Sequence, residues 1–464
     1  MSAPPVTAGE ALAALRDREL GALELLETVI ARVESTQLGA VDLLDADGAR
    51  RQARRAESEL ARGDGRSLSG LPILVKDVID VAGLPTRGGT ARWCRRPERD
   101  GDCVAALRAA GAVVIGKGHT NELAFGIDGR NPHRPPCLNP HDKHALPGGS
   151  SSGPAVAIGG GLALGALGTD TSGSIRVPAA LCGIAGLRPT HGLLSLRGVL
   201  PLAPSYDVVG PLAPCVADLR TLFTALLAAA SGPRALVERV REESRRPTID
   251  DRGGATAIAR VGVLEQLLDP AVCEPAVAAA VRDAAAALAR LGLTSEPVSV
   301  PELDGVLAVH RDVQVPEAAA SVQMLGVPEH ELGAEVRERV RSAREIGPER
   351  HLHALRERER IAGAIAGALP LRGVLLAPGC PVPAPSRDAR EWRSRSGEVR
   401  SIRETLLSCT VPLTQSRGPV LSVPVTAVDG RPVGVQLLAR TGEDAALLEL
   451  GVHLERELAG ALID

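Results

Sequence analysis

The chain has 464 residues, a formal net charge of −3 and 44% hydrophobic residues. A chain of this length can bury a large core, and a charge so close to zero predicts no nucleic-acid or anionic-membrane partner. It contains two Phe, two Trp and one Tyr. The core must therefore be mainly aliphatic, and the aromatic platforms on which single-stranded nucleic acids stack are scarce.

Helical periodicity marks the beginning of the chain, where leucines recur among polar residues. A β-prone apolar run follows and ends on Lys76. Burial at a strand end would remove water from this lysine and lower its pKa, and the alternative is a solvated lysine at the surface. The elements expected up to residue 115 are helices at 8–35 and 47–63, a strand at 71–75, a helix at 102–110 and a strand at 112–115.

Targeting and metal-binding signals are weak along the whole sequence. Residues 1–20 lack the basic region and apolar core of a signal peptide. The longest apolar run, residues 154–168, is rich in glycine and too short to cross a membrane. The eight cysteines form no CxxC pair or zinc-like cluster, and no two histidines have a typical metal-ligand spacing. We therefore expect a cytoplasmic protein without a metal or a membrane partner.

Residues 147–192 combine serine and glycine in two loops. The first loop carries Ser150, Ser151 and Ser152 after two glycines, and the second carries Ser174 between glycine and isoleucine. Glycines beside serines allow the backbone to approach a bound group and direct N–H groups at it. A serine nucleophile needs a base and an oxyanion hole. Two such loops indicate acyl chemistry, although an isolated Gly-Ser-rich loop is usually only a turn.

The same stretch predicts a helix at 153–163, a strand at 164–168 and a helix from Val177. Asp170 and Arg176 flank the loop that holds Ser174. We expect these two opposite charges to pair and support the loop, and the alternative is that both are solvated at the surface.

Together with the segment GLPILVKD at residues 70–77, this stretch resembles the amidase signature family, whose members hydrolyse amides with a Ser-Ser-Lys triad. The resemblance extends with gaps over residues 10–440. By motif position it implies that Ser174 is the nucleophile and that Lys76 is the base. It also implies that Ser150 is the bridging serine and lies on a cis peptide bond.

The resemblance further implies an oxyanion hole made by the backbone N–H groups of Thr171, Ser172, Gly173 and Ser174. Ser172 stands where most relatives carry glycine. A negative φ would accommodate serine without strain and let its hydroxyl face the pocket, whereas a positive φ would strain the loop; we expect the negative φ. The residues assigned to the oxyanion hole or the substrate are Thr171, Ser172, Gly173, Gly149 and Ser151, and the supporting residues are Asp170 and Arg176.

For the fold, the resemblance implies an α/β protein with a large mixed twisted β-sheet sandwiched between α-helical layers. We expect one catalytic domain over residues 1–464. Its parts are an N-terminal helical segment at about 8–65, a catalytic core at about 66–215, a variable helical cover at about 216–370 and closing strands at about 371–464. Within the last two parts we expect strands at 260–264, 371–377, 420–428 and 433–438, and a turn near Pro297.

The implied reaction is hydrolysis of the C–N bond of a small carboxamide through an acyl-enzyme, without a cofactor. The implied partner is a small-molecule amide, and a homodimer is compatible with the sequence. Three alternatives stay open: a glutamine-amidase subunit of an amidotransferase, a urea-derivative hydrolase of the allophanate or carboxybiuret type, and a catalytically silent scaffold subunit. Residues 413–418 depart from the Asn-Leu-Thr-Gly of many relatives, which leaves the substrate open.

Overall fold

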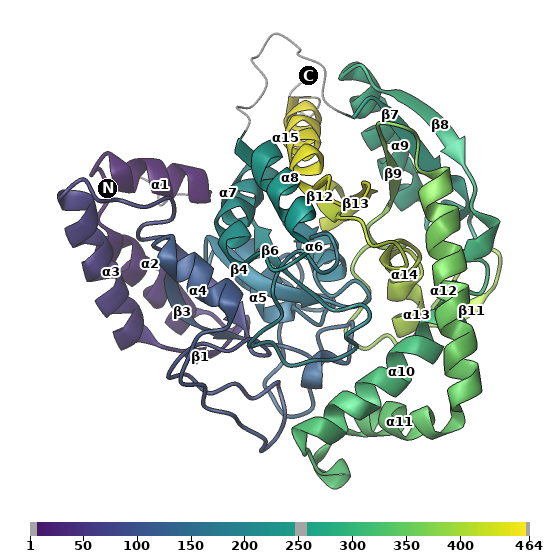
Figure 1. Cartoon of the computed structure of the whole chain (residues 1–464), viewed down its shortest axis with the longest axis horizontal. Coiled ribbons are helices and arrows are strands. Elements are labelled where there is room, and N and C mark those ends of the chain that lie inside the picture. The colour runs from purple at the N-terminus through teal and green to yellow at the C-terminus, as the bar shows by residue number, and fades with distance from the viewer. Residues whose placement is uncertain (1–6, 246–257, 461–464) are drawn as a thin grey trace.

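The computed structural model describes residues 7–245 and 258–460 (Figure 1). An 11-stranded mixed sheet organises these residues, and its strand order is β1-β3-β2-β4-β6-β5-β12-β13-β9-β7-β8. The strands are β1 (Val41–Leu44), β2 (Pro72–Lys76), β3 (Val113–Gly118), β4 (Gly165–Asp170), β5 (Ala185–Arg188), β6 (Val208–Ala213), β7 (Arg260–Leu264), β8 (Thr294–Val298), β9 (Gly373–Pro378), β12 (Val420–Val428) and β13 (Arg431–Leu438). A separate hairpin pairs β10 (Glu391–Arg393) with β11 (Val399–Ser401).

Helices precede and follow these strands along the chain. They are α1 (Ala8–Arg16), α2 (Ala22–Ser35), α3 (Ala46–Ala61), α4 (Asp102–Ala109), α5 (Ser152–Gly159), α6 (Arg176–Cys182), α7 (Val216–Leu226), α8 (Arg234–Arg245), α9 (Pro275–Arg290), α10 (Val306–Leu325), α11 (Ala334–Ser342), α12 (Pro348–Ala368), α13 (Ile402–Leu407), α14 (Thr410–Thr414) and α15 (Asp444–Gly460). Among them no helix has the length and apolar character that a membrane crossing requires.

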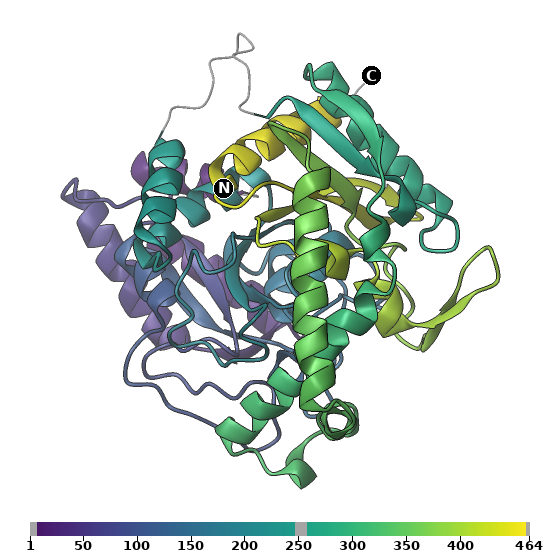
Figure 2. The same ribbon diagram turned by 45° about the vertical axis from the view of Figure 1, so that its right-hand side comes forward.

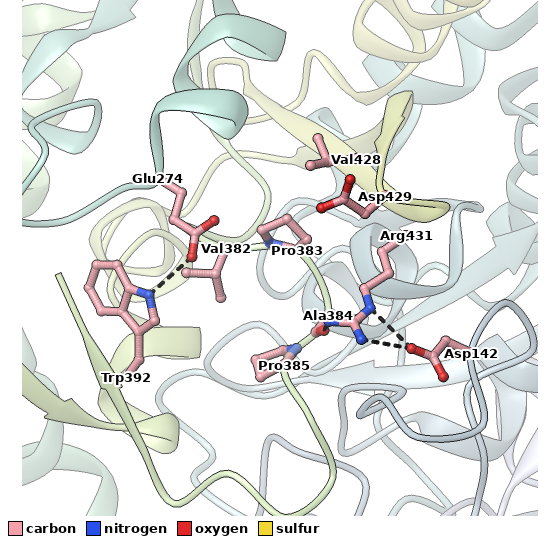
Figure 3. A pocket seen from close by; sticks show the side chains of 10 residues that line it. All are labelled: Asp142, Glu274, Val382, Pro383, Ala384, Pro385, Trp392, Val428, Asp429 and Arg431. Carbon is pink, nitrogen blue, oxygen red and sulfur yellow. Dashed lines mark hydrogen bonds and ion pairs between the residues drawn. The ribbon is translucent and has the colours of Figure 1, made fainter. Parts of the chain in front are cut away.

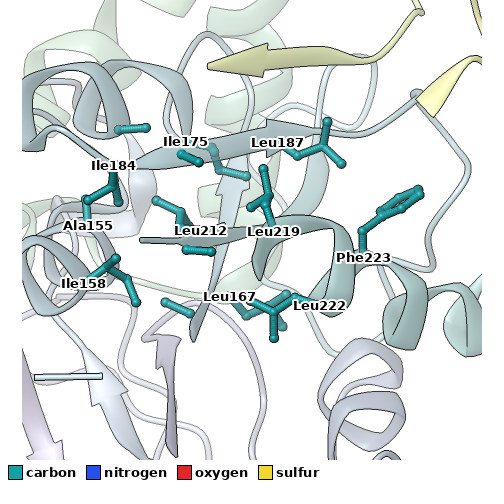
Figure 4. Packing of buried hydrophobic residues seen from close by; sticks show 14 of the residues in the cluster. Ala155, Ile158, Leu167, Ile175, Ile184, Leu187, Leu212, Leu219, Leu222 and Phe223 are labelled. Carbon is teal, nitrogen blue, oxygen red and sulfur yellow. The ribbon is translucent and has the colours of Figure 1, made fainter. Parts of the chain in front are cut away.

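Two glycines of β4 show that the sheet separates two helical layers. Side chains of a strand alternate between the two faces of its sheet. The Cβ position of Gly165 faces Leu222 of α7, whereas that of Gly168, three residues later, faces Ser151 at the start of α5. Figure 4 shows this core, with strand residues such as Leu167 between the side chains of α5 and α7. The layered α/β fold expected for the chain is therefore confirmed.

Strand direction places the serine and lysine segments at one edge of the sheet. β2 is parallel to both β3 and β4, and Val75 is in register with Leu167. Parallel strands present their carboxyl ends at the same edge. Lys76 at the end of β2 therefore lies beside Thr169 near the end of β4, where the loop to Ser174 begins.

A helical cover lies over this edge. α10 packs against α11, α12 and α14, and Figure 2 shows α12 as a long helix across the front of the molecule. A small apolar cluster joins the cover to the loop before β6, because Val313 of α10 and Ala354 of α12 pack on Tyr206. The cover is thus held on the catalytic half by buried side chains.

The structure corrects three sequence expectations. The helix expected at 8–35 is two helices, because Arg18 adopts a positive φ and Gly21 is the N-cap of α2. The helix expected at 153–163 ends at Gly159, since two more glycines follow and Gly161 adopts a positive φ.

The third correction concerns the cover, which contributes two strands rather than one. β8 occupies the position expected to be a turn, and Pro297 lies inside it. Proline is tolerated there because β8 is the last strand of the sheet, so its missing N–H leaves no neighbour unpaired. The short strands β1, β5 and β6 were also not expected from the sequence.

We predict that Leu212→Ala lowers the free energy of unfolding by about 2–5 kcal/mol, because Leu212 is fully buried in β6 and its removal leaves a cavity. Urea denaturation measures the change. The matched control is Leu371→Ala, at a leucine that is 78% exposed, for which we expect a change within about 0.5 kcal/mol. Equal effects of the two substitutions would contradict this description of the core.

Candidate active site

Lys76 is fully buried at the end of β2. Its Nζ lies 2.7 Å from Ser150 Oγ and 2.8 Å from Thr169 Oγ1. Removal from water lowers the pKa of Lys76 to about 7, although the carboxylates of Asp170 and Asp207 favour its charged form. The site therefore contains a lysine that is partly neutral near pH 7 and is in contact with a serine hydroxyl.

The serine-rich loop is fastened to both β4 and the second loop. The Gly149–Ser150 peptide bond is cis. Ser151 N–H donates to the carbonyl of Ser174 at 3.1 Å, and Ser151 Oγ exchanges hydrogen bonds with the backbone of Thr169 at 3.2 and 3.3 Å. The hydroxyl of Ser151 is thus used in holding the loop, and Ser150 is the one that faces the lysine.

Asp170 shapes the loop that carries Ser174. Its Oδ1 accepts the N–H of Gly173 at 2.8 Å, and its Oδ2 accepts the N–H of Ile175 at 3.2 Å. Gly173 has a φ of +133°, and a Cβ there would lie 2.5 Å from Thr410 Oγ1, so glycine is required. The bond to Asp170 removes the Gly173 N–H from the expected set of oxyanion donors.

The other three N–H groups of that set stay available. Within the described residues no hydrogen-bond partner is present for the N–H groups of Thr171, Ser172 and Ser174. Ser172 is not among the residues with a positive φ. Serine therefore fits this position without the strain that a positive φ would impose.

Two buried arginines neutralise Asp170. Arg176 Nε lies 3.0 Å from Asp170 Oδ2, and Arg188 Nη1 lies 3.3 Å from Asp170 Oδ1, with all three side chains 0–1% exposed. Burial alone would raise the pKa of Asp170, but the two guanidinium groups hold that pKa below its ordinary value. The pairing of Asp170 with Arg176 is as expected, whereas Arg188 was not singled out from the sequence.

Arg176 also connects the loop to the C-terminal part of the chain. Its Nη1 donates to the carbonyl of Thr410 and to Gln436 Oε1, both at 3.0 Å, and its Nη2 donates to Thr414 Oγ1 at 2.7 Å. Thr410 and Thr414 belong to α14 and Gln436 to β13. Thr414, within the segment at residues 413–418, therefore contacts the arginine that supports the loop carrying Ser174.

The outer side of the loop is held by the cover. Ser172 Oγ lies 2.8 Å from His310 Nε2 and accepts a hydrogen bond from Gln314 Nε2 at 2.8 Å. Burial lowers the pKa of His310 to about 3, so its ring stays neutral. Thr171 Oγ1 donates to Asp207 at 2.6 Å. The Ser172 hydroxyl is thus bonded to α10, which the sequence could not show.

Ser174 faces a pocket between the loop and the cover. Ser174 is 4% exposed, and none of the described residues forms a hydrogen bond with its hydroxyl, which leaves that hydroxyl available to a bound group. The pocket is lined by Ala124, Phe125, Gly126, Ile127, Ser172, Ser174, Leu202, Gln314, Arg403 and Leu407.

Sequence reasoning did not identify several residues that contact Lys76 or Ser172 or that line the pocket. Thr169 could have been found, because it lies at the end of a strand parallel to that of Lys76. His310, Gln314 and Arg403 belong to helices far along the chain, and nothing local in the sequence marks them as neighbours of Ser174.

A larger cavity of about 350 Å³ lies elsewhere, between the segment around Ala384 and the turn of β12 and β13 (Figure 3). Two polar pairs border it: Trp392 Nε1 donates to Glu274 at 3.2 Å, and Arg431 pairs with Asp142 at 2.8 Å. None of the serines, and neither Lys76 nor Asp170, lines this cavity. Among the described residues no group of three or more His, Cys, Asp and Glu side chains is arranged to hold a metal ion.

The Amidase family model matches residues 24–448. The chain belongs to the amidase family. This match confirms the resemblance found in the sequence, and members with solved structures extend the likeness to the whole fold. One, described as a crystal structure of amidase, is 34% identical, has a TM-score of 0.86 and is matched over 97% of this chain and 99% of that chain.

Two further members of the amidase family are informative. A glutamyl-tRNA(Gln) amidotransferase subunit from Anaeromyxobacter sp. (strain K) is 34% identical over 478 residues, which cover 97% of this chain and 95% of that relative. A structure described as a vestigial protein complex that reveals the evolutionary origins of an s-triazine catabolic enzyme is 29% identical. It has a TM-score of 0.87 and is matched over 97% of this chain and 98% of that chain.

We predict that Asp170→Asn lowers the free energy of unfolding by about 3–5 kcal/mol, because two buried guanidinium groups lose their counter-charge. Chemical denaturation followed by circular dichroism measures the loss. The control is Glu359→Gln, whose pair with Arg417 is 60% exposed on both sides, and we expect a loss below about 1 kcal/mol. If Asp170→Asn lowered the free energy of unfolding no more than Glu359→Gln does, the buried network would contribute little to stability.

Proposed function

We propose that this member of the amidase family hydrolyses the C–N bond of a small carboxamide, with Ser174 as nucleophile, Ser150 as the bridging hydroxyl and Lys76 as the base. The observation that carries the proposal is the buried Lys76 amine, 2.7 Å from Ser150 Oγ, together with the burial that lowers the pKa of Lys76 to about 7. A neutral amine in contact with a serine hydroxyl can accept a proton, which a surface lysine cannot do at neutral pH.

In this mechanism neutral Lys76 accepts the proton of Ser150, which in turn takes the proton of Ser174. The Ser174 oxygen attacks the substrate carbonyl, and the C–N bond breaks as the leaving nitrogen regains the proton through Ser150. Water then attacks the acyl carbon as it gives a proton to Lys76 through Ser150, the bond between Ser174 and the acyl carbon breaks, and the relay returns the proton to the Ser174 oxygen. No group outside the chain is needed for any of these proton transfers.

The negative charge on the attacked carbonyl oxygen needs donors that are already in place. The N–H groups of Thr171, Ser172 and Ser174, which have no partner among the described residues, support this role. Gly173 contributes through its backbone shape, because its own N–H is bonded to Asp170. Gly149 and Ser151 border the site as part of the loop that presents Ser150.

A second candidate function is that of a glutamine-hydrolysing subunit, which the name of the Anaeromyxobacter relative favours. An ammonia assay with glutamine as substrate, with and without a co-purifying chain, separates the two functions. A free-standing amidase hydrolyses small amides by itself, whereas a subunit requires its partner for glutamine turnover. The alternative of a urea-derivative hydrolase is tested by measuring ammonia release from biuret-type compounds in the same assay. The similarity in fold to the s-triazine-related structure is the reason to test it.

The single-domain organisation, the cytoplasmic location and the small-molecule partner remain predictions. We propose one catalytic domain because the sheet runs without interruption from β1 near the N-terminus to β13 near the C-terminus. A homodimer is likewise a prediction, which light scattering of the purified chain would decide.

We predict that Ser174→Ala abolishes hydrolysis and covalent labelling by a fluorophosphonate probe, because the attacking hydroxyl is lost. Mass spectrometry of the labelled wild-type protein should place the adduct on Ser174. The control is Ser152→Ala, whose hydroxyl bonds with His119 at 2.9 Å and takes no part in the proton relay. An adduct on Ser150 would overturn the roles given to the serines, and unlabelled wild-type protein would favour the silent scaffold.

We predict that kcat rises with pH through about 7, because Lys76 must be neutral and burial lowers its pKa to about 7. Below that pH the neutral fraction, and with it kcat, should fall about tenfold for each pH unit. Lys76→Arg should be inactive at every pH, since a guanidinium does not lose its proton. Rates between pH 5 and 9 measure this profile, and a flat profile with an active Arg variant would rule out the lysine as base.

A further inference from the structure

The pocket beside Ser174 contains one charged side chain, that of Arg403 from α13. The cavity volume is only about 10 Å³ in this structure, so a bound substrate must displace some of the lining side chains. Ser172 and Gln314 also border it, but their side chains hydrogen-bond to each other at 2.8 Å. The other lining residues apart from Ser174 are apolar or glycine. Arg403 is therefore the group best able to recognise a polar part of a substrate.

Arg403 has no hydrogen-bond or ion-pair partner among the described residues, although two carboxylates lie in its surroundings. Asp128 is bonded to Asn121 at 3.0 Å and paired with Arg130 at 2.8 Å. Glu404 accepts hydrogen bonds from Ser401 at the start of α13, at 2.7 and 3.1 Å. Both acids are thus engaged elsewhere, and the guanidinium is left without a counter-ion in direct contact.

A second guanidinium, that of Arg339, lies near Arg403 on the ring of Phe125. Arg339 and Arg403 lie over the ring of Phe125, at 5.3 and 5.9 Å from its centroid. Arg339 is occupied, because it donates to the carbonyl of Phe125 and to Glu335. Burial lowers the pKa of Arg403 to about 10, so it stays charged at neutral pH. Of the two guanidinium groups on the phenyl ring, Arg403 lines the pocket, and it has no hydrogen-bond or ion-pair partner among the described residues.

We propose that Arg403 binds a carboxylate on the acyl part of the substrate, so that the protein acts on short amides that also carry a carboxylate. A guanidinium binds a carboxylate through two parallel hydrogen bonds, which fixes orientation as well as affinity. The carboxylate would supply the missing counter-charge, and the amide carbonyl at the other end would reach Ser174. This inference rests on the proposed amidase function and adds the substrate class.

The test compares monoamides of oxalic, malonic, succinic and glutaric acid with the neutral diamides of the same acids. Each pair has the same shape and differs in one charge. At the best chain length we expect kcat/KM to be about 10- to 100-fold higher for the monoamide, the range that one charge-assisted contact supplies. The preferred length then reports the distance between the Ser174 and Arg403 side chains.

Substitutions at Arg403 test whether this side chain causes the preference for monoamides over diamides. Arg403→Gln should abolish the preference for the monoamide, mainly by raising the KM for the monoamide, so that the ratio of kcat/KM between monoamide and diamide falls to about one. Arg403→Lys keeps the charge and should retain part of the preference. The matched control is Arg400→Gln, because Arg400 lies on β11, pairs with Glu398 at 2.7 Å and is absent from the pocket.

The possible outcomes are separable. Equal rates of the wild-type protein on monoamide and diamide would overturn the proposal without the use of any variant. A preference that survives in Arg403→Gln, with Ser174 still labelled by a fluorophosphonate, would overturn it as well. Absence of both labelling and hydrolysis in the wild type would instead refute the amidase function itself.

Discussion

The catalytic half of the molecule depends on one buried charge, the carboxylate of Asp170. It ends β4, accepts backbone N–H groups of the loop that carries Ser174, and is neutralised by Arg176 and Arg188. A buried carboxylate is stable only when it is paired and hydrogen-bonded. Because Arg176 also bonds to α14 and β13, the same charge connects the loop carrying Ser174 to the C-terminal part of the chain.

The second constraint is the exclusion of water from Lys76. The lysine lies at the end of an interior strand, where it contacts the hydroxyls of Ser150 and Thr169. Burial disfavours the ammonium form, while Asp170 and Asp207 oppose that effect. If Asp170 were unpaired, its carboxylate would favour the charged form of Lys76 more strongly. Arg176 and Arg188 offset that effect, and so they help to keep the pKa of Lys76 low.

The helical cover does more than close the site. The hydroxyl of Ser172 is bonded to His310 and Gln314 of α10. The loop that carries Ser174 is thus linked to the helix that borders the pocket. Arg403 reaches the same pocket from α13. The candidate site is thus assembled from different parts of the chain, with Lys76 on β2, Ser150 and Ser174 on neighbouring loops, Gln314 on α10 and Arg403 on α13.

The sequence by itself determined the family and the layered fold, and it pointed to Lys76, Ser150 and Ser174 as the candidate site. These follow from short motifs, because glycines beside serines are needed where the backbone must approach a bound group closely. It also predicted the pairing of Asp170 with Arg176, which lie six residues apart. Tertiary structure alone decided that Thr169 contacts the lysine, that the Gly173 N–H is occupied, and that Pro297 lies in an edge strand. The physical reason is that burial, strand partners and counter-charges arise only when distant segments pack, so no local pattern encodes them.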